Sequence, residues 1–185
     1  MTTPMSDSLE QTFARLVQPH FPALYRAALR LTRSRPDAED LVQEVCVRAC
    51  ARLEELARIT ESRAWLMRTL YHLFIDWSRR RRRSPAVALA ETDDAGWLSE
   101  EPGPDRVAEA CGMHERLVAV WDRLDAEQRA LLSLHAEGYD LGELAVILLT
   151  NRNALSGRLH RARQRLAKLL ATSEREPALR LVETK

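Results

Sequence analysis

The sequence has 185 residues, and its 28 basic and 27 acidic side chains leave a formal charge of +1. Leucine, alanine and arginine account for 29, 25 and 26 residues, whereas valine and isoleucine together reach only 13. Because the abundant residues favour helices and the scarce ones favour strands, the composition excludes a largely β fold and predicts an all-α protein. A hydrophobic content of 45% also excludes wholesale disorder.

Several functional classes lack their sequence signals. No apolar run approaches the roughly 20 residues that cross a bilayer, and the first 35 residues show no signal-peptide pattern. The three cysteines fit a reducing cytosol, so we expect a cytoplasmic protein. Cys46 and Cys50 have a spacing that could serve a metal, but no neighbouring His or Cys completes a site. Without a phosphate loop or a nucleophile–base pair, we expect no catalysis, metal or cofactor.

The charges are strongly segregated along the chain. Residues 37–62 hold seven acids and three arginines, and residues 63–83 hold seven arginines and one acid. Residues 84–105 then hold six acids and no base, and residues 151–172 hold five arginines, one lysine and no acid. A single cluster of this kind is usually a solvated helix face. Two basic helices, each with an apolar face opposite its basic face, favour two contacts with nucleic acid.

Apolar periodicity predicts helices in the first third of the chain. Pro19 and Pro22 interrupt residues 8–32, which we interpret as two short helices or one bent helix. A second helix is predicted from Asp37 to Leu56, and its acidic first turn suits the positive end of the helix dipole. Its apolar stripe is Leu41, Val45, Ala49 and Leu53.

The next predicted helix starts after residues 60–62 and ends before Ser84-Pro85. Its apolar stripe is Trp65, Leu66, Thr69, Leu70, Leu73, Phe74 and Trp77. The polar residues Arg68, His72, Asp76 and Arg79 fall on the opposite side at successive turns. We therefore assign the two tryptophans to the core and the polar side to a ligand or to solvent.

The second half of the chain predicts another helical unit. Residues 85–105 are rich in proline, glycine and acids, which indicates a flexible acidic linker. Helices are expected over 106–123, from a capping box at Asp125 to Ala136, and over 141–148. The short helix, a tight turn and a basic amphipathic helix to residue 171 together predict a helix-turn-helix. Residues 172–185 are expected to fray.

Three segments resemble bacterial sigma factors. Residues 37–45 (DAEDLVQEV) resemble region 2.2, and residues 64–80 resemble regions 2.3 and 2.4. Glu143-Leu-Ala and residues 158–163 (RLHRAR) resemble the helix-turn-helix of region 4. Their order, their spacing and the chain length are similar to the extracytoplasmic-function group of the sigma-70 family. The resemblance implies two small helical domains, region 2 over 8–84 and region 4 over 106–171, joined by the linker.

The resemblance further implies a dissociable subunit of RNA polymerase that selects and opens promoter DNA, usually under control of an anti-sigma factor. Contacts with core polymerase would be the β′ clamp for region 2 and the β flap for region 4. The residues implied at the clamp are Asp37, Asp40, Gln43 and Glu44. Those implied at the −10 element are Thr60, Ser62, Arg63, Arg68, His72, Asp76, Arg79 and Arg80. The loop before the helix would receive an unstacked base, while arginines would bind phosphates.

Region 4 would read the −35 element as duplex DNA. Base edges would meet Arg152, Asn153, Ser156 and His160. Phosphates would meet Arg158, Arg161 and Arg163. Two departures from the family pattern put inherited base preferences in question. His72 stands where an asparagine is usual, and residues 153–157 (NALSG) replace the usual Gly-Thr-Val-Lys-Ser.

Two other classes of function compete with this interpretation. A freestanding helix-turn-helix regulator explains residues 125–171 but leaves the motifs of residues 37–83 unexplained. A sigma-like decoy that captures an anti-sigma factor would have no need of phosphate contacts, yet both basic helices retain their arginines. A pull-down with core polymerase separates the first alternative from a sigma factor, and promoter-dependent transcription separates the second.

Overall fold

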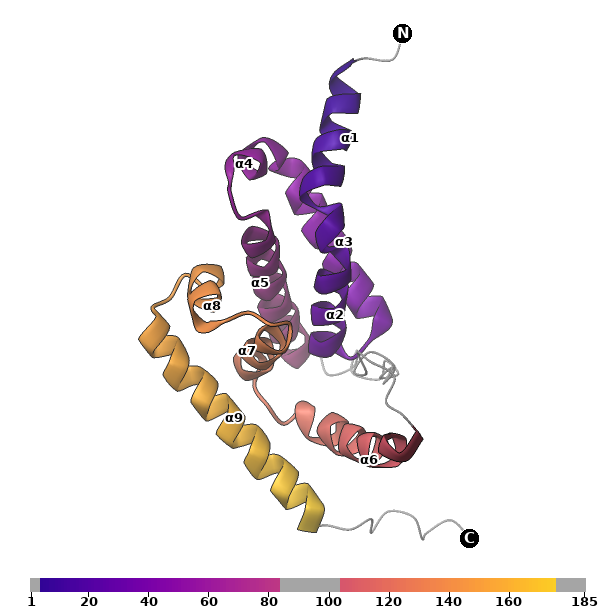
Figure 1. Cartoon of the computed structure of the whole chain (residues 1–185), viewed down its shortest axis with the longest axis vertical. Coiled ribbons are helices and arrows are strands. Elements are labelled where there is room, and N and C mark those ends of the chain that lie inside the picture. Colours follow the sequence, from indigo (N-terminus) through magenta and orange to yellow (C-terminus); the bar gives the residue numbers. More distant parts are fainter. Residues whose placement is uncertain (1–3, 84–103, 176–185) are drawn as a thin grey trace.

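A computed structural model describes residues 4–83 and 104–175, and these residues form helices without any strand (Figure 1). The helices are α1 (Pro4–Leu16), η1 (Gln18–His20, a 3₁₀ helix), α2 (Phe21–Thr32), α3 (Arg35–Ala51), α4 (Leu53–Arg58), α5 (Ser62–Arg83), α6 (Pro104–Trp121), α7 (Ala126–Ala136), α8 (Leu141–Ile147) and α9 (Arg152–Arg175). The predicted all-α class is confirmed. The predicted linker lies almost entirely outside the described residues, as do residues 176–185 of the predicted tail.

Helices α2, α3 and α5 pack side by side and form the N-terminal half of the core (Figure 1). Pro19 and Pro22 stand in the first turns of η1 and α2, where a missing N–H has no helical partner to lose. The first 32 residues are therefore broken into separate helices, as the prolines predict. All four residues of the stripe predicted for residues 37–56 are buried, three on α3 and Leu53 on α4.

The chain departs from the prediction where a single helix was expected to run to Leu56. Helix α3 ends at Ala51, Arg52 leaves the helical conformation with φ −124° and ψ 27°, and α4 begins at Leu53. The break lets Leu53 and Leu56 both become buried, with α4 packed against α1. Burying one leucine side chain stabilises the fold by about 1.5–3 kcal/mol. Burial of both leucines therefore compensates for the interrupted helix.

Local signals set the helix boundaries in the C-terminal half. Asp125 and Gln128 form the predicted capping box at α7, and Asp140 and Glu143 form another at α8. Gly138 has φ +91°, which glycine adopts without the steric cost of a Cβ atom. Helices α6 and α9 differ from their expected limits, since α6 spans 104–121 and α9 continues four residues beyond position 171.

The two halves share one apolar core. Helix α7 packs against α2 and α5, and α8 packs against α5. Buried residues of both halves, from Val17 to Phe74 and from Ala130 to Leu159, belong to one continuous cluster. A smaller cluster around Trp121 and Leu169 joins α6 to α9. The two predicted domains are thus in direct contact, and we call the contact of α2 and α5 with α6, α7 and α8 the seam.

Candidate polymerase and nucleic-acid interfaces

The predicted polymerase-binding residues lie along α3. Ser34 caps this helix, its hydroxyl accepting a hydrogen bond from the Asp37 N–H at 3.4 Å. Asp40 and Gln43 are exposed, and the half-exposed Glu44 accepts a hydrogen bond from Arg48 one turn later at 2.9 Å. Asp37 differs from the others, because it forms an ion pair with Arg81 at 3.2 Å. Three of the four residues therefore face solvent, and Asp37 ties α3 to α5.

Five of the eight predicted −10 residues are exposed. They are Thr60, His72, Asp76, Arg79 and Arg80. The His72 ring packs edge-on against Tyr71 at 5.3 Å between centroids, and Asp76 and Arg79 approach to 3.6 Å. Trp65 and Trp77 are half-buried and pack against the core, as predicted. The polar side of α5 is therefore open to solvent along its second half.

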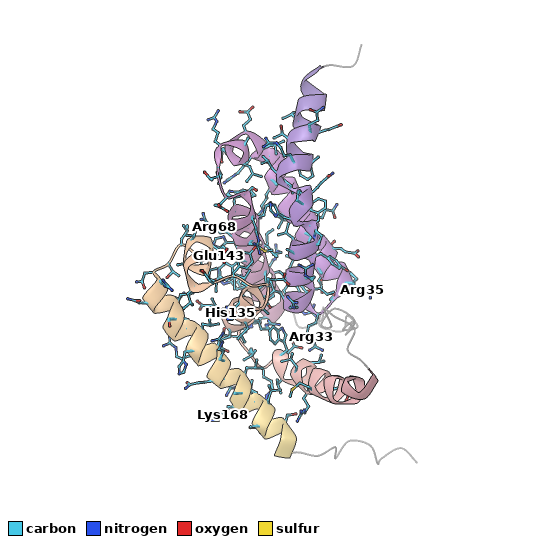
Figure 2. All side chains as sticks on the ribbon, in the orientation of Figure 1. Arg33, Arg35, Arg68, His135, Glu143 and Lys168 are labelled. Carbon is cyan, nitrogen blue, oxygen red and sulfur yellow. The ribbon has the colours of Figure 1, made fainter. Side chains whose placement is uncertain are left out.

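The other three predicted −10 residues are engaged within the protein. Ser62 lies 3.4 Å from the His20 ring nitrogen. Arg63 donates to the Tyr139 hydroxyl at 2.8 Å, and its guanidinium lies 4.3 Å from the centre of that ring. Arg68 reaches α8, as Figure 2 shows, and donates to two of its backbone carbonyls, those of Ile147 at 3.0 Å and Val146 at 3.1 Å.

Burial at the Arg63 contact perturbs two neighbouring groups. Burial raises the pKa of the Tyr139 hydroxyl, and the positive charge of Arg63 opposes that rise. Burial lowers the pKa of His20, and the same arginine lowers it further. Arg63 is itself half-buried, and its guanidinium is held by the hydroxyl and the ring of Tyr139. Its charge is consequently used inside the protein rather than offered at the surface.

Helix α9 presents the predicted −35 residues on its outer face. Leu155, Leu159 and Ala162 are buried and form the apolar face of this helix. The seven residues of the predicted interface are all exposed: Arg152, Asn153, Ser156, Arg158, His160, Arg161 and Arg163. Asn151 accepts a hydrogen bond from the Ala154 N–H at 2.7 Å and starts the helix. Among these residues an ion pair forms at Arg158, with Glu127 at 2.8 Å.

Comparison with known proteins places this geometry in a family. Residues 16–84 match the family model described as Sigma-70 region 2. The chain is 34% identical over 88% of its length to the ECF RNA polymerase sigma factor SigE of Mycolicibacterium smegmatis, of which it covers 63%. It is 32% identical over 90% of its length to the ECF RNA polymerase sigma factor EcfG of Rhodopseudomonas palustris, of which it covers 87%. The chain belongs to the extracytoplasmic-function (ECF) sigma factors.

A solved structure agrees with this family. The chain is similar to the sigma factor RpoE of Bartonella quintana, crystallised with the anti-sigma factor NepR, with a TM-score of 0.61 and 25% identity. The similarity covers 89% of the present chain and 97% of the RpoE chain. The predicted family and all-α fold are therefore confirmed.

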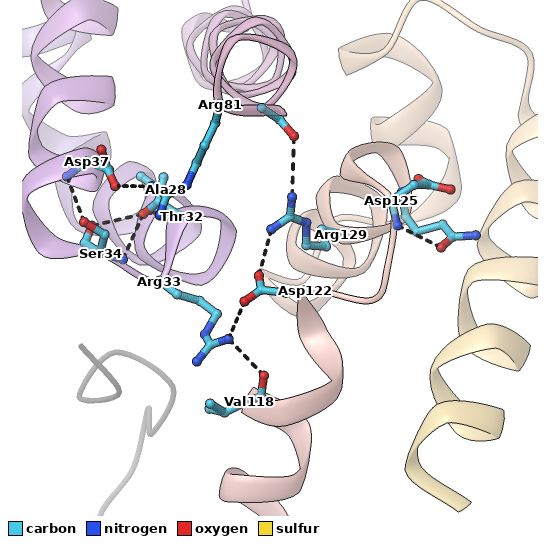
Figure 3. Close-up of polar contacts among 12 residues, drawn as sticks. Ala28, Thr32, Arg33, Ser34, Asp37, Arg81, Val118, Asp122, Asp125 and Arg129 are labelled. Atoms are coloured by element: carbon cyan, nitrogen blue, oxygen red, sulfur yellow. Dashed lines mark hydrogen bonds and ion pairs between the residues drawn. The ribbon is translucent and has the colours of Figure 1, made fainter. Parts of the chain in front are cut away.

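The sequence-based interpretation of this ECF sigma factor missed the residues that hold its halves together. Glu137 accepts ion pairs from two α2 arginines, Arg26 at 3.2 Å and Arg30. Asp122 accepts from Arg33 at 2.8 Å and from Arg129 at 3.2 Å (Figure 3). Arg33 closes α2 in the left-handed conformation with φ +56° and also donates to the Val118 carbonyl at 2.9 Å. No local motif marks these contacts. Their partners lie 85 to 111 positions apart in the sequence, except for Asp122 and Arg129, which are 7 positions apart.

The described residues contain neither a cluster of metal ligands nor a membrane-spanning helix. Within residues 4–83 and 104–175, no three His, Cys, Asp or Glu side chains gather as a metal site would require. In the same residues no helix combines the length and apolarity needed to span a bilayer.

Proposed function

We propose that this ECF sigma factor binds core RNA polymerase through α3 and promoter DNA through α5 and α9, without catalysis of its own. The observation that carries the proposal is α9, whose buried leucine stripe leaves its arginine face exposed. An exposed basic helix behind a short helix and a tight turn is the element that enters a major groove. We infer that the protein acts in the cytoplasm, where polymerase and promoters are.

Transcription in vitro tests the proposal as a whole. Core polymerase is combined with the protein and fragments of genomic DNA, and the start sites are mapped. We expect transcripts that depend on the protein and share −10 and −35 elements. Duplex binding without any protein-dependent transcript would instead support a freestanding regulator, and the absence of both duplex binding and transcripts would support a decoy.

The β′ clamp is the proposed partner of α3. Asp40 and Gln43 are exposed beside Glu44, and Val47 on the same helix is 57% exposed. Replacing Asp40 and Glu44 with lysine should weaken polymerase binding in a competition assay, because it reverses two charges that would face a basic partner. The matched control replaces Glu54 and Glu55, exposed acids on α4, with lysine. Equal affinities of the two double variants would remove α3 from the interface.

The −10 element is the proposed ligand of the exposed side of α5 and the loop before it. His72 offers a flat ring and a hydrogen-bonding edge where the family usually has an amide. His72→Ala should leave polymerase binding unchanged and reduce promoter opening, and His72→Asn should restore part of it. Permanganate footprinting of the −10 region measures the opening directly. Equal footprints for the wild type and His72→Ala would exclude this residue from the site.

Promoter binding would require the seam to open. The names of the two elements place their centres about 25 base pairs apart, or ~85 Å along B-form DNA. Helix α9 has 24 residues and is therefore only about 36 Å long. With α8 bonded to Arg68, the two helices of the protein lie too close together to reach both elements. We therefore propose that region 4, with its β-flap contact, separates from region 2 on the polymerase.

An anti-sigma factor is a further proposed partner. The related RpoE was crystallised in complex with the anti-sigma factor NepR, and its structure covers nearly the same length of chain. A protein of this kind would act by covering the surfaces that bind polymerase and DNA. Its effect would be seen as loss of the protein-dependent transcripts when it is added before core polymerase.

A further inference from the structure

A polar cavity of about 290 Å³ lies on the seam, between the end of α5 and the start of α7. Its lining includes Ser78, Arg81 and Arg82 from α5, Asp122 after α6, and Arg129 from α7. The volume is far more than the roughly 10–15 Å³ of such space that one water molecule needs. The cavity therefore has room for a small polyatomic ligand, and both halves of the protein contribute to its wall.

Positive charge dominates this wall. Three guanidinium groups line the cavity, whereas Asp122 is the one carboxylate among the described lining residues. Asp122 is itself shared, because its two oxygens accept from Arg33 and Arg129. Arg81 has a partner in Asp37, but Arg82 is exposed and has no hydrogen bond or ion pair within the described part of the chain.

Arg129 is the most deeply buried of the three cavity arginines. It is 8% exposed and lies over the Phe74 ring, with its guanidinium carbon 5.3 Å from the ring centre. Its Nη1 is held by Asp122 at 3.2 Å, and its Nη2 lies 3.5 Å from the Ser78 hydroxyl (Figure 3). Its Nε is buried and has no partner among the described residues. Each Nη group carries two N–H bonds and uses one for Asp122 or Ser78, so the second N–H of each remains available to an acceptor in the cavity.

The surroundings of Arg129 disfavour its charge mainly through burial. Burial lowers the pKa of its guanidinium, Asp122 and Asp125 raise it, and the positive charges of Arg82 and Arg33 lower it. Ser78 is 2% exposed and accepts a hydrogen bond from Arg129, which leaves the hydroxyl proton of Ser78 free to donate. Guanidinium forks and a hydroxyl donor together match the oxygens of a phosphate group.

We propose that the seam cavity is a binding site for a small phosphate-bearing anion held by Arg82 and Arg129 from opposite sides of the seam. Since α5 supplies Ser78 and Arg82 and α7 supplies Arg129, the complete site exists only while the seam is closed. The anion therefore binds the closed arrangement and stabilises it by linkage. The closed seam keeps Arg63 and Arg68 from DNA, so the anion would oppose promoter binding, and this consequence rests on the proposed function. The binding of the anion itself does not rest on it.

Calorimetry on the full chain at fixed ionic strength tests the site, with pyrophosphate as the probe. Arg82→Ala should weaken binding about tenfold or more, the effect of losing one charge-assisted hydrogen bond. The matched control is Arg83→Ala, which removes the same charge from the next, exposed position and leaves the cavity lining unchanged. Arg129→Lys, which keeps the charge and loses the fork, should also weaken binding. No binding by the wild type, or equal losses for Arg82→Ala and Arg83→Ala, overturns the proposal.

Two further arms identify the source of the phosphate and the link to closure. Titration with orthophosphate and with a nucleoside diphosphate distinguishes a free inorganic anion from a nucleotide. The ligand that binds with the higher affinity identifies the source of the phosphate. Glu137→Lys, which lies outside the cavity lining and disrupts the seam, should abolish pyrophosphate binding. Unchanged binding by that variant, with the seam shown to be open by small-angle scattering, would overturn the coupling. None of these measurements uses polymerase or a promoter, so they are independent of transcription.

Discussion

Helices α5 and α9 carry similar charge in the sequence and use it differently in the structure. Residues 63–83 and 151–172 each have six more basic than acidic side chains. On α5, three of the seven arginines are held by residues of other helices or loops: Arg63 by Tyr139, Arg68 by α8 and Arg81 by Asp37. On α9, Arg152, Arg161 and Arg163 are exposed and have no hydrogen bond or ion pair in the described part of the chain.

The difference separates two kinds of basic helix. The charge of α9 is available to a polyanion as the protein stands, whereas part of the charge of α5 is held at the seam. A phosphate that binds Arg63 or Arg68 must compete with hydrogen bonds of 2.8–3.1 Å in a partly desolvated place. We therefore expect the free protein to bind duplex DNA through α9 first.

The largest expected effect comes from breaking the seam at Glu137. Its side chain is 4% exposed and receives two arginines of α2, so Glu137→Lys leaves three positive charges together. Because Arg26 is 47% exposed and Arg30 11% exposed, the loss lies at the lower end of the roughly 3–5 kcal/mol that breaking a fully buried ion pair costs. We expect a larger radius of gyration by small-angle scattering and a lower urea midpoint. Glu115→Lys, an exposed position on α6, is the control, and identical scattering by the two variants would contradict the role of Glu137.

A smaller effect is expected at the first turn of α9. Arg152→Ala should remove about 1–3 kcal/mol of discrimination at one base pair of the −35 element, if this arginine reads a guanine. Fluorescence anisotropy on duplexes from mapped promoters, with single base-pair changes, measures this loss. Arg163→Ala should instead weaken all duplexes alike and flatten the salt dependence. Equal losses on every duplex for both variants would remove direct readout from Arg152.

A stabilising change is expected in the middle of α9. A glycine inside a helix costs about 1 kcal/mol relative to alanine. A Cβ atom added at Gly157 would lie 3.5 Å from Arg161 Nη1, an ordinary contact with a flexible side chain. Gly157→Ala should therefore raise the free energy of unfolding by up to about 1 kcal/mol, measured by urea denaturation. A loss of stability would show that this position needs the space for another reason.

The smallest expected effect concerns the cap of α8 and depends on pH. Hydrogen bonds from the Glu143 and Gly142 N–H groups lower the pKa of the exposed Asp140 carboxyl. A carboxyl with a depressed folded pKa stabilises the fold above its unfolded pKa, and the stabilisation is lost as the pH falls through the folded value. Asp140→Ala should thus lower the melting temperature at pH 7, and the difference from the wild type should shrink in acid. A pH-independent difference would contradict this assignment.

Local sequence patterns predict most of the helices, the exposed basic face of α9 and the family. The capping residues at Asp125 and Asp140 and the α9 stripe at Leu155, Leu159 and Ala162 act within a few residues of themselves. Periodicity and capping chemistry report on such short-range effects. The break at Arg52 escaped prediction because it depends on leucines that become buried against α1, a separate element.

The tertiary structure alone decided which basic residues remain available. Arg63 and Arg79 look alike in the sequence, yet Arg63 meets Tyr139, which lies 76 positions further along the chain, and Arg79 stays exposed. The same holds for Arg129, which lies one turn into a capped helix and is buried beside Asp122 and Ser78. Local patterns record propensity and charge, whereas burial and pairing depend on which distant helices pack together. The sequence thus determined that this protein has two basic helices, and packing at the seam determined how much of the charge of α5 is exposed.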